Sequence, residues 1–467
     1  MIELTNNNKI IWEEDFKIDI ENLEAIVTGY LASSEFQRLQ LYDSYYEAEN
    51  TFISERVSDK ADRGKTPNNK IPTAYYATIT DTLAGYMFSD IQYNPRSNID
   101  KKYAEVFNNL MFDNDSDIKD MRTGIRALAY NQGVELVYST GDGLSSPIIR
   151  YASLDPRQII LIYNNKIEPD LYAGIRVMLA DGDGLYNIDV IYKDEWQYYT
   201  MDNKHKIIVR QKPENLFFDE CPVVVYNTND MSNRSVFHKV IRYINALDFL
   251  ITGNANDMEK LADALLVLTK VLKDEDLRHL NELKAIMDIS KDERAEYLEK
   301  NTDPAFREYA SKLLIQEIHK HSHVIDWYSP DNGLSGDISG KALKIRLFDM
   351  DMFSRKIEKI FKKGVEKKIR LLNTLLGAVG EKIGEVDIIF NRVLPDDFDE
   401  SAPILEKLTF ISDESKMERL GMNVESELKR LEAQKTLGAE LFKLNNPIDT
   451  DGSNDEDSDK IDNRDEA

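Results

Sequence analysis

Three of the six histidines lie within five residues of one another, as His319, His321 and His323. On a helix, His319 and His323 would share one face at i and i+4, a spacing at which two imidazoles can bind zinc. A zinc protease also needs a glutamate directly after the first histidine and a third ligand, but Lys320 follows His319. The pattern therefore favours a solvated helix end. A metal-dependent nucleic-acid enzyme that uses the three histidines and acids such as Asp326 stays open as an alternative.

The other candidate motifs do not point to catalysis. A stretch at residues 336–342 looks like a phosphate-binding loop, but its glycine spacing is one residue short and Ala342 replaces the hydroxyl that would bind magnesium. The single cysteine, Cys221, precedes a proline at the start of a predicted strand and has no neighbouring histidine, which indicates a buried structural thiol. The sequence contains no serine elbow, paired-carboxylate motif or dinucleotide fingerprint. We therefore predict no catalytic residue, no cofactor and no resident metal.

The composition is that of an acidic chain that can fold. Its 467 residues correspond to about three domains of roughly 150 residues each, and 42% of them are apolar, enough to build a core. The 84 acidic residues outnumber the 59 lysines and arginines, giving a net charge of −25 that disfavours a protein that coats DNA. One cysteine cannot form a disulfide within the chain, which favours a cytosolic origin. The longest apolar run, at residues 261–272, is shorter than the roughly 20 residues that cross a bilayer.

The first half of the chain changes from helical to strand patterning. Apolar residues at spacings of three and four predict two helices within residues 23–56, one over residues 73–88 and helical structure over residues 100–132. Apolar residues then alternate from residue 133 to 226, between turn signals such as Asn164-Asn165. The alternation predicts an antiparallel region rather than a βαβ array.

The following region is predicted to be helical. Helical spacing covers residues 237–272, where polar residues at 252–257 would kink or expose the helix, and resumes at residues 304–321. A charged stretch at residues 273–303 lies between the two and looks like a small inserted module. We expect another long helix over residues 339–372, which holds eleven lysines or arginines against four acids. That helix is thus strongly basic inside an acidic chain.

The C-terminal part combines a strand, a helical region and an acidic segment. A strand is predicted over residues 386–390 and helical structure over residues 401–444. The last nineteen residues, 449–467, contain nine acids and two bases and almost no apolar side chain. This composition predicts a disordered tail.

Four segments follow one another in a characteristic order. The first runs from Asn68-Asn69-Lys70-Ile71-Pro72 through Tyr75-Tyr76 to Gly85-Tyr86, and the second is Cys221-Pro222-Val223-Val224-Val225-Tyr226-Asn227. The third runs from Ile241 to Asp263, and the last and most specific is Ser339-Gly340-Lys341-Ala342-Leu343-Lys344. Together they resemble the portal protein family of tailed bacteriophages, in the branch found in long-tailed phages of Gram-positive hosts. The resemblance covers residues 23–395, and it departs at Lys341, where the family commonly has an apolar residue.

The resemblance implies an α+β fold that is mainly helical, with a β-rich wing, long stem helices, a small clip insertion and a helical C-terminal crown. It also implies a ring of about twelve copies at one capsid vertex, with a central channel for packaging and ejecting double-stranded DNA. The implied segments are the wing at 1–232 and 340–395, the stem at 233–266 and 305–323, the clip at 267–304, the tunnel loop at 324–339, the crown at 396–448 and the disordered acidic tail at 449–467.

The resemblance further assigns residues to the channel. The tunnel loop would point into it, and the residues nearest the tip would be Asp337, Ile338 and Ser339. The basic residues that would face either DNA or the acids of a neighbouring subunit are Lys341, Lys344 and Arg346. Because neutralising many phosphates holds DNA tightly, a conduit should confine its cations to one zone and be acidic elsewhere.

The implied partners are further copies of the chain, double-stranded DNA in transit, the terminase large subunit, a head-completion or adaptor protein, the scaffold protein and the major capsid protein. No membrane is implied. The protein would be part of the virion at the capsid vertex, assembled in the host cytoplasm, and it would have no enzymatic activity. Besides the metal-dependent enzyme, a virion or scaffold protein without a channel stays open as an alternative.

Overall fold

The computed structural model describes most of the chain between residues 3 and 392 and a few residues beyond. Two compact units divide the sequence, Met1–Leu394 and Pro395–Ala467. In the second unit the Lys416 amide donates to the Ser412 carbonyl oxygen at 3.0 Å, as in a helical turn. All elements discussed below belong to the first unit. The described residues are 3–4, 10–12, 17–56, 67–96, 101–140, 148–180, 185–271, 304–328, 345–378, 380–381, 384–392, 412–414, 416, 428 and 430.

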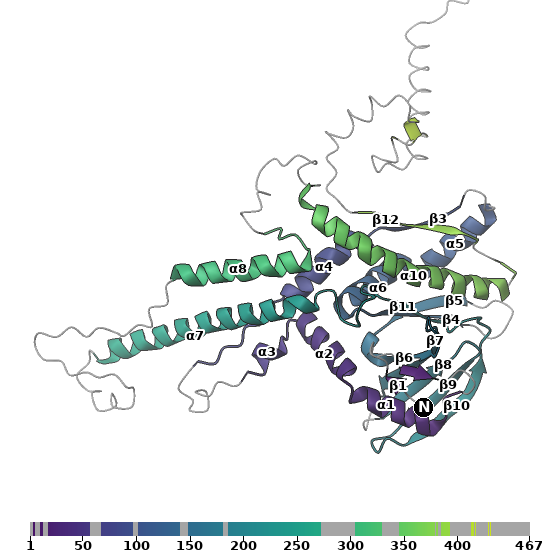
Figure 1. Cartoon of the computed structure of the whole chain (residues 1–467), viewed down its shortest axis with the longest axis horizontal. Coiled ribbons are helices and arrows are strands. Elements are labelled where there is room, and N and C mark those ends of the chain that lie inside the picture. The colour runs from purple at the N-terminus through teal and green to yellow at the C-terminus, as the bar shows by residue number, and fades with distance from the viewer. Residues whose placement is uncertain are drawn as a thin grey trace, which may run out of the picture. The chain divides into compact units, whose positions relative to one another are not determined.

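The strands β4 to β11 follow one another in the chain between helices α6 and α7, and in Figure 1 the sheets lie on the side away from the far ends of α7 and α8. The helices are α1 (Ile20–Leu31), α2 (Ser34–Tyr46), α3 (Thr51–Ser54), α4 (Tyr75–Phe88), α5 (Lys101–Asp113), α6 (Ser116–Tyr130), α7 (Ile241–Val271), α8 (Pro304–Ser322) and α10 (Phe348–Ala378), with the short 3-10 turns η2 (Pro156–Gln158) and η3 (His238–Val240). The strands are β1 (Glu3–Leu4), β2 (Ile10–Trp12), β3 (Ile91–Pro95), β4 (Gly133–Thr140), β5 (Ile148–Leu154), β6 (Ile159–Asn164), β7 (Leu171–Leu179), β8 (Tyr186–Ile191), β9 (Glu195–Met201), β10 (Ile207–Asn215), β11 (Val223–Tyr226) and β12 (Val386–Phe390). The expected α+β class is confirmed.

Side-chain caps set the starts of the first helices. The Asp19 carboxylate accepts a hydrogen bond from the Asn22 amide at 2.8 Å and begins α1, and the Ser33 hydroxyl accepts one from the Phe36 amide at 3.1 Å and begins α2. Residues 23–56 form three helices rather than the two expected. The extra break follows α2, where Ala48 adopts a positive φ of 56° and α3 starts three residues later.

The largest sheet has seven strands in the order β1-β2-β6-β7-β8-β9-β10. Its pairs are antiparallel apart from β2 with β6, so the predicted antiparallel region is confirmed for the strands from β6 to β10. Helix α1 covers one face, where its Leu23 and Val27 side chains are buried in a cluster with Ile162, Ile175 and Ile188. The alternation seen in the sequence thus corresponds to one buried face of this sheet.

A second sheet, in the order β11-β4-β5, carries the larger core (Figure 1). Helices α4, α6 and α10 pack with it in one hydrophobic cluster that includes Phe88, Tyr226 and Phe361. Helix α10 approaches β11 closely because residue 364 is a glycine. A Cβ atom at Gly364 would lie 2.5 Å from the Tyr226 ring, so a larger residue does not fit without movement.

A third, two-stranded sheet joins distant parts of the sequence. Strand β12 was expected at residues 386–390, and its partner β3 was not. The two pair in antiparallel register from Val386 with Pro95 to Phe390 with Ile91. This sheet closes α10 back onto the region of α4 and α5.

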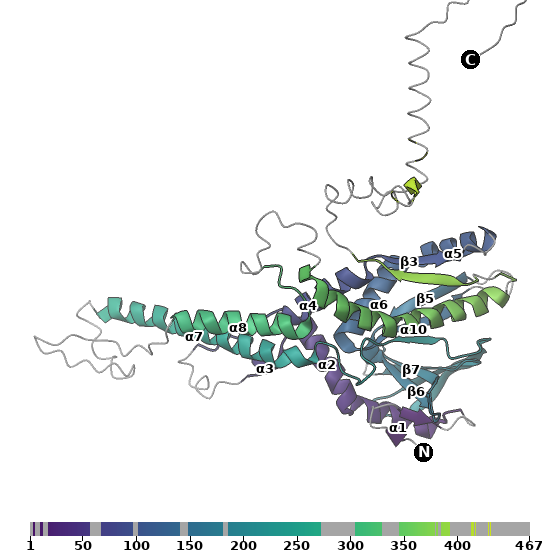
Figure 2. The ribbon, with the colours of Figure 1, turned by 45° about the horizontal axis from the view of Figure 1, so that its top comes forward.

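Helices α7 and α8 run side by side and extend away from the sheets in both views (Figures 1 and 2). Helix α7 continues unbroken through the polar residues 252–257, where we expected a kink or simple exposure. Those side chains have partners. Arg307 of α8 donates to Asn254 at 2.9 Å and to Asp257 at 2.8 Å, and the Ile71 amide donates to the Thr252 hydroxyl at 3.1 Å.

Candidate functional site

The corner where α8 ends includes residues 324–328, the described part of the expected tunnel loop. Helix α8 stops at Ser322, and His323 adopts a positive φ of 59° that turns the chain away from the helix axis. The His319 ring nitrogen Nδ1 lies 2.9 Å from the Val324 carbonyl oxygen, and the Val324 side chain is buried. The first residues after α8 are therefore held against the helix end, and the chain continues from Tyr328 toward residues outside the described part.

The three histidines contact three different partners. His321 lies 3.0 Å from the carboxylate of Glu317 and stacks on the Tyr243 ring of α7. His323 lies 2.9 Å from the Asp349 carboxylate and stacks on the Phe353 ring, both in α10.

The ring of His319 is 3.9 Å from the Asp326 carboxylate and meets the Tyr75 ring edge-on. The expectation that His319 and His323 share a helix face is wrong, because α8 ends before His323. Among the described residues, no three histidine, cysteine or acidic side chains converge as metal ligands would. The imidazoles of His321 and His323 thus join the end of α8 to α7 and α10, and that of His319 joins it to α4 and to the residues that follow α8.

A cavity of about 260 Å³ lies at this corner and brings the end of α8 together with the start of α10. Arg346 is exposed on its rim, and Leu347 forms a turn before α10 begins at Phe348. The helix expected from Ser339 is thus interrupted at Leu347. The other predicted channel and basic residues, Asp337, Ile338, Ser339, Lys341 and Lys344, lie outside the described residues.

Helix α10 carries one lysine into the protein interior. The Lys368 amine pairs with the Asp120 carboxylate of α6 and lies 3.5 Å from the Glu135 carboxylate of β4, with all three side chains almost fully buried. Burial lowers the pKa of Lys368, but the two carboxylates outweigh it and hold the pKa well above its ordinary value. Lys368 therefore stays charged and fixes α10 to both elements.

Sequence reasoning missed this charged group. The available signal was the position of Lys368, which lies seven residues after Phe361 and four before Leu372, within the apolar stripe of the helix. A lysine on a buried stripe needs a carboxylate partner, because an isolated buried charge is costly. Nothing local to the sequence identified Asp120 and Glu135 as those partners.

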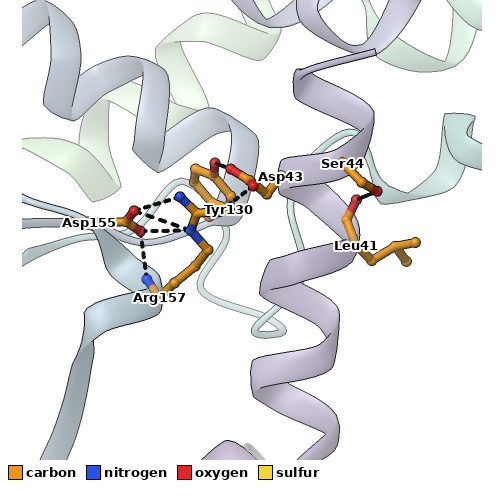
Figure 3. Close-up of polar contacts among 6 residues, drawn as sticks. All are labelled: Leu41, Asp43, Ser44, Tyr130, Asp155 and Arg157. Atoms are coloured by element: carbon orange, nitrogen blue, oxygen red, sulfur yellow. Dashed lines mark hydrogen bonds and ion pairs between the residues drawn. The ribbon is translucent and has the colours of Figure 1, made fainter. Parts of the chain in front are cut away.

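A second polar cluster, also missed, joins η2 to helices α2 and α6 (Figure 3). Arg157 pairs with Asp155 at 2.7 Å and with Asp43 of α2, and the Tyr130 hydroxyl of α6 donates to Asp43 at 2.7 Å. Burial alone would raise the pKa of Asp155, but its hydrogen bonds to Arg157 hold the pKa below the usual value. The cluster ties the large sheet to the helical part of the unit.

A comparison with known protein families identifies the family of this chain. The family model described as "Phage portal protein, SPP1 Gp6-like" matches residues 32–439. The chain belongs to this portal protein family. The match extends the resemblance seen in the sequence from residue 395 through most of the expected crown.

Individual relatives of this portal-family chain are distant. It is 22% identical over 392 residues to the "Portal protein" of Clostridium phage phiCD119, covering 78% of this chain and 84% of that protein. A chain in the solved "Neck of native GTA particle computed with C12 symmetry" is 9% identical with a TM-score of 0.37, covering 83% of this chain and 94% of that one. A chain in the "Virion of native gene transfer agent (GTA) particle" is 10% identical with a TM-score of 0.36, covering 84% and 94%.

One further observation concerns membranes. In the part of the chain that the structure describes, no helix combines the length and the apolar character needed to cross a bilayer.

Proposed function

We propose that the protein assembles into a ring of about twelve copies at one capsid vertex and forms the channel through which double-stranded DNA is packaged and ejected. The observation that supports this most strongly is family membership over residues 32–439. The paired helices α7 and α8 agree with it, because they extend from a β-rich body as a stem would. The ring needs no nucleotide site or metal in this chain, and we propose no enzymatic activity.

The proposed division of the chain follows the elements except at α7, which continues to Val271, five residues past the proposed end of the stem segment at 266. The stem corresponds to α7 and α8 (233–266 and 305–323), and the wing to the sheets with α1 to α6 and α10 (1–232 and 340–395). The clip at 267–304, the crown at 396–448 and the acidic tail at 449–467 fall almost entirely outside the described residues. The bounds of these three segments are those that the family resemblance implies.

The channel is proposed to be acidic with a confined basic zone. A chain of net charge −25, repeated around a ring, repels phosphate and lets a duplex slide. The tunnel loop at 324–339 would carry Asp337, Ile338 and Ser339 to the DNA. The end of α8 supports this assignment, because His319 holds Val324 at the start of that loop and the neighbouring His323 contacts Asp349 of α10.

The confined basic zone is proposed to follow the loop. Lys341, Lys344 and Arg346 would form it, facing DNA or a neighbouring copy. Arg346, the member that the structure describes, is exposed at the rim of the corner cavity.

The proposed partners and location follow from the same role. The ring would dock the terminase large subunit, then a head-completion or adaptor protein, and would meet the scaffold and major capsid proteins during assembly in the host cytoplasm. It would stay in the virion at the vertex. A metal-dependent enzyme built on the three histidines has no supporting geometry, because the rings are engaged with separate partners.

Thiol labelling tests the position of the tunnel loop. Ile338→Cys and Ile208→Cys are each made in a Cys221→Ser background, and Ile208 is the control because it is 57% exposed on β10. N-ethylmaleimide should label both positions in every copy. A bulky polyethylene-glycol maleimide should label every copy at 208 but only a fraction at 338, since inward-facing loops crowd the lumen. Complete labelling at 338 by the bulky reagent would contradict a channel position.

A further inference from the structure

A cavity lies where α1, the start of α2, the end of α6 and strand β6 meet, and it shares no residue with the corner cavity at the end of α8. Its volume is about 210 Å³. Apolar and polar side chains both line it, among them Ile26, Tyr30, Glu35, Arg38, Leu39 and Leu161. A dry apolar cavity of about 150 Å³ is large enough to bind benzene. The cavity beside α1 therefore has room for one ring with a short side chain.

Helix α1 keeps this cavity open because small residues line it. Ala25 and Gly29 lie one helical turn apart, and both border the cavity. A Cβ atom at Gly29 would meet nothing within 4 Å outside its own helix backbone. Glycine inside a helix costs about 1 kcal/mol relative to alanine, and at Gly29 neither a close contact nor a positive φ requires it in the described structure. The space beside Gly29 is thus available to a bound molecule.

Arg38 supplies the cavity with a cation that has unused donors. A guanidinium carries five N–H donors, and the ion pair that Arg38 forms with Glu35 is long, with the nitrogen and oxygen atoms 3.4 Å apart. The Arg38 Nε atom is buried and, among the described residues, has no hydrogen-bond partner. Because the side chain is only 15% exposed, water can reach few of its donors. An acceptor inside the cavity would satisfy them.

Glu35 only partly balances the charge of Arg38. Its side chain is 19% exposed, and burial raises the pKa of its carboxyl, although Arg38 acts in the opposite direction. Burial thus disfavours the charged form of the one acid that pairs with Arg38. A second carboxylate could approach the guanidinium more closely than 3.4 Å and accept two parallel hydrogen bonds from it.

We propose that this cavity binds a small organic carboxylate, with its apolar body of about one ring packed between α1 and β6 and its carboxylate paired with Arg38. The apolar walls select for the body, and the planar guanidinium selects for a planar carboxylate. The site lies within one copy of the chain, so it does not depend on ring formation and is tested separately from it.

Ligand-observed NMR on the full chain tests the site. The probes are hydrocinnamate, a phenyl ring on a short carboxylate chain, and its neutral amide, which has the same shape. Saturation-transfer titrations should show saturable binding of hydrocinnamate. The amide should bind about tenfold more weakly, because it lacks the charge that pairs with Arg38. Absence of saturable binding, or an amide that binds as tightly as the carboxylate, would overturn the proposal.

Substitutions at the polar end should act in opposite directions. Arg38→Gln should weaken hydrocinnamate binding about tenfold and leave amide binding nearly unchanged, a split that a general loss of structure would not produce. Glu35→Gln removes the competing carboxylate and should strengthen hydrocinnamate binding about threefold. Parent-like binding by Arg38→Gln, or weaker binding by Glu35→Gln, would overturn the assignment of Arg38 as the anchor.

Filling the cavity tests the place of binding. Gly29→Leu puts a side chain into the open space beside α1 and should abolish binding of both probes. The control is Gly85→Leu in α4, where a Cβ atom also meets nothing within 4 Å and which does not line the cavity. The control should bind both probes as the parent does, and circular dichroism should show both variants folded. Binding retained by Gly29→Leu, or lost equally in the two variants, would overturn the proposal.

Discussion

Lys368 illustrates how a single buried charge can organise three elements. Its partners Asp120 and Glu135 lie in α6 and β4, and the Tyr226 hydroxyl of β11 donates to Glu135 at 2.6 Å. The Tyr93 hydroxyl also donates to Asp120, so each carboxylate is engaged by more than one donor. Removing the cation leaves two acids buried with too little compensation, which costs more than the pair contributes when intact.

We expect Lys368→Met to lower the free energy of unfolding by about 3–5 kcal/mol. Urea denaturation followed by circular dichroism measures it. The matched control is Lys359→Met on the outer face of the same helix, which should stay within about 0.5 kcal/mol of the parent. Adding Asp120→Asn and Glu135→Gln to Lys368→Met should restore part of the loss. A Lys368→Met protein as stable as the control would contradict the account of this cluster.

His238 makes the stability of the fold depend on pH. Its Nδ1 atom lies 3.0 Å from the Tyr42 hydroxyl, which can donate to a neutral ring. Burial lowers the pKa of His238, as do three nearby guanidinium groups, those of Arg234, Arg38 and Arg242. The unfolded chain has a histidine pKa of about 6.5, so it binds this proton before the folded chain does.

The contribution of His238 to stability is therefore present above about pH 6.5 and is lost as the pH falls through the lower folded pKa. We expect His238→Gln, which can still accept from Tyr42, to flatten the decline of unfolding free energy between about pH 7 and pH 5. The exposed His205→Gln serves as the control and should keep the parent's slope. Identical slopes in all three proteins would exclude a titrating role for His238.

At individual positions, the sequence predicted the structure correctly where the prediction depended only on neighbouring residues. Cys221 was predicted to be a buried thiol and is 2% exposed. The sequence showed that three histidines cluster near residue 320. It did not show that His323 pairs with Asp349 of α10, because that contact depends on how α8 ends. The Lys368 partners were equally out of reach, since they precede it by more than two hundred residues.

The packing of α10 on β11 depends on the absence of a side chain at Gly364. Alanine there would gain helix propensity but place its Cβ atom 2.5 Å from the Tyr226 ring. We expect Gly364→Ala to destabilise the fold by about 1–3 kcal/mol, the usual cost of overpacking. Gly253→Ala in α7, where nothing lies within 4 Å of the new atom, should instead stabilise by about 0.5–1 kcal/mol. Thermal denaturation of the two variants compares them, and a stabilising Gly364→Ala would contradict the close approach.

At the scale of elements, the spacing of apolar residues predicted the helices and strands that bury one face against the core. The helices α4, α7 and α8 follow the expected ranges closely, α5 and α6 lie within the expected helical region 100–132, and the strands from β4 to β11 lie within the expected strand region 133–226. The strand β3 was missed because its partner β12 is about three hundred residues away and its Pro95 weakens any strand signal. The polar stretch of α7 was misread because its partners, Arg307 and the segment near Ile71, are far away in sequence.

For the molecule as a whole, order of motifs carried more information than any motif alone. The family resemblance is confirmed over residues 32–439 by the family model, although the relatives are only distantly similar. The tunnel loop, clip, crown and tail stay predictions, since they lie largely outside the described residues. The composition could not locate the channel, because a net charge is a sum over the chain and does not say where the charged residues lie around a ring axis.

The ring is the claim on which the rest depends, and negative-stain electron microscopy of the purified protein, with mass from light scattering on the same sample, tests it most directly. We predict rings with a central hole and about twelve or thirteen copies of the chain. A monodisperse monomer or dimer that persists at high protein concentration and across salt would contradict the channel.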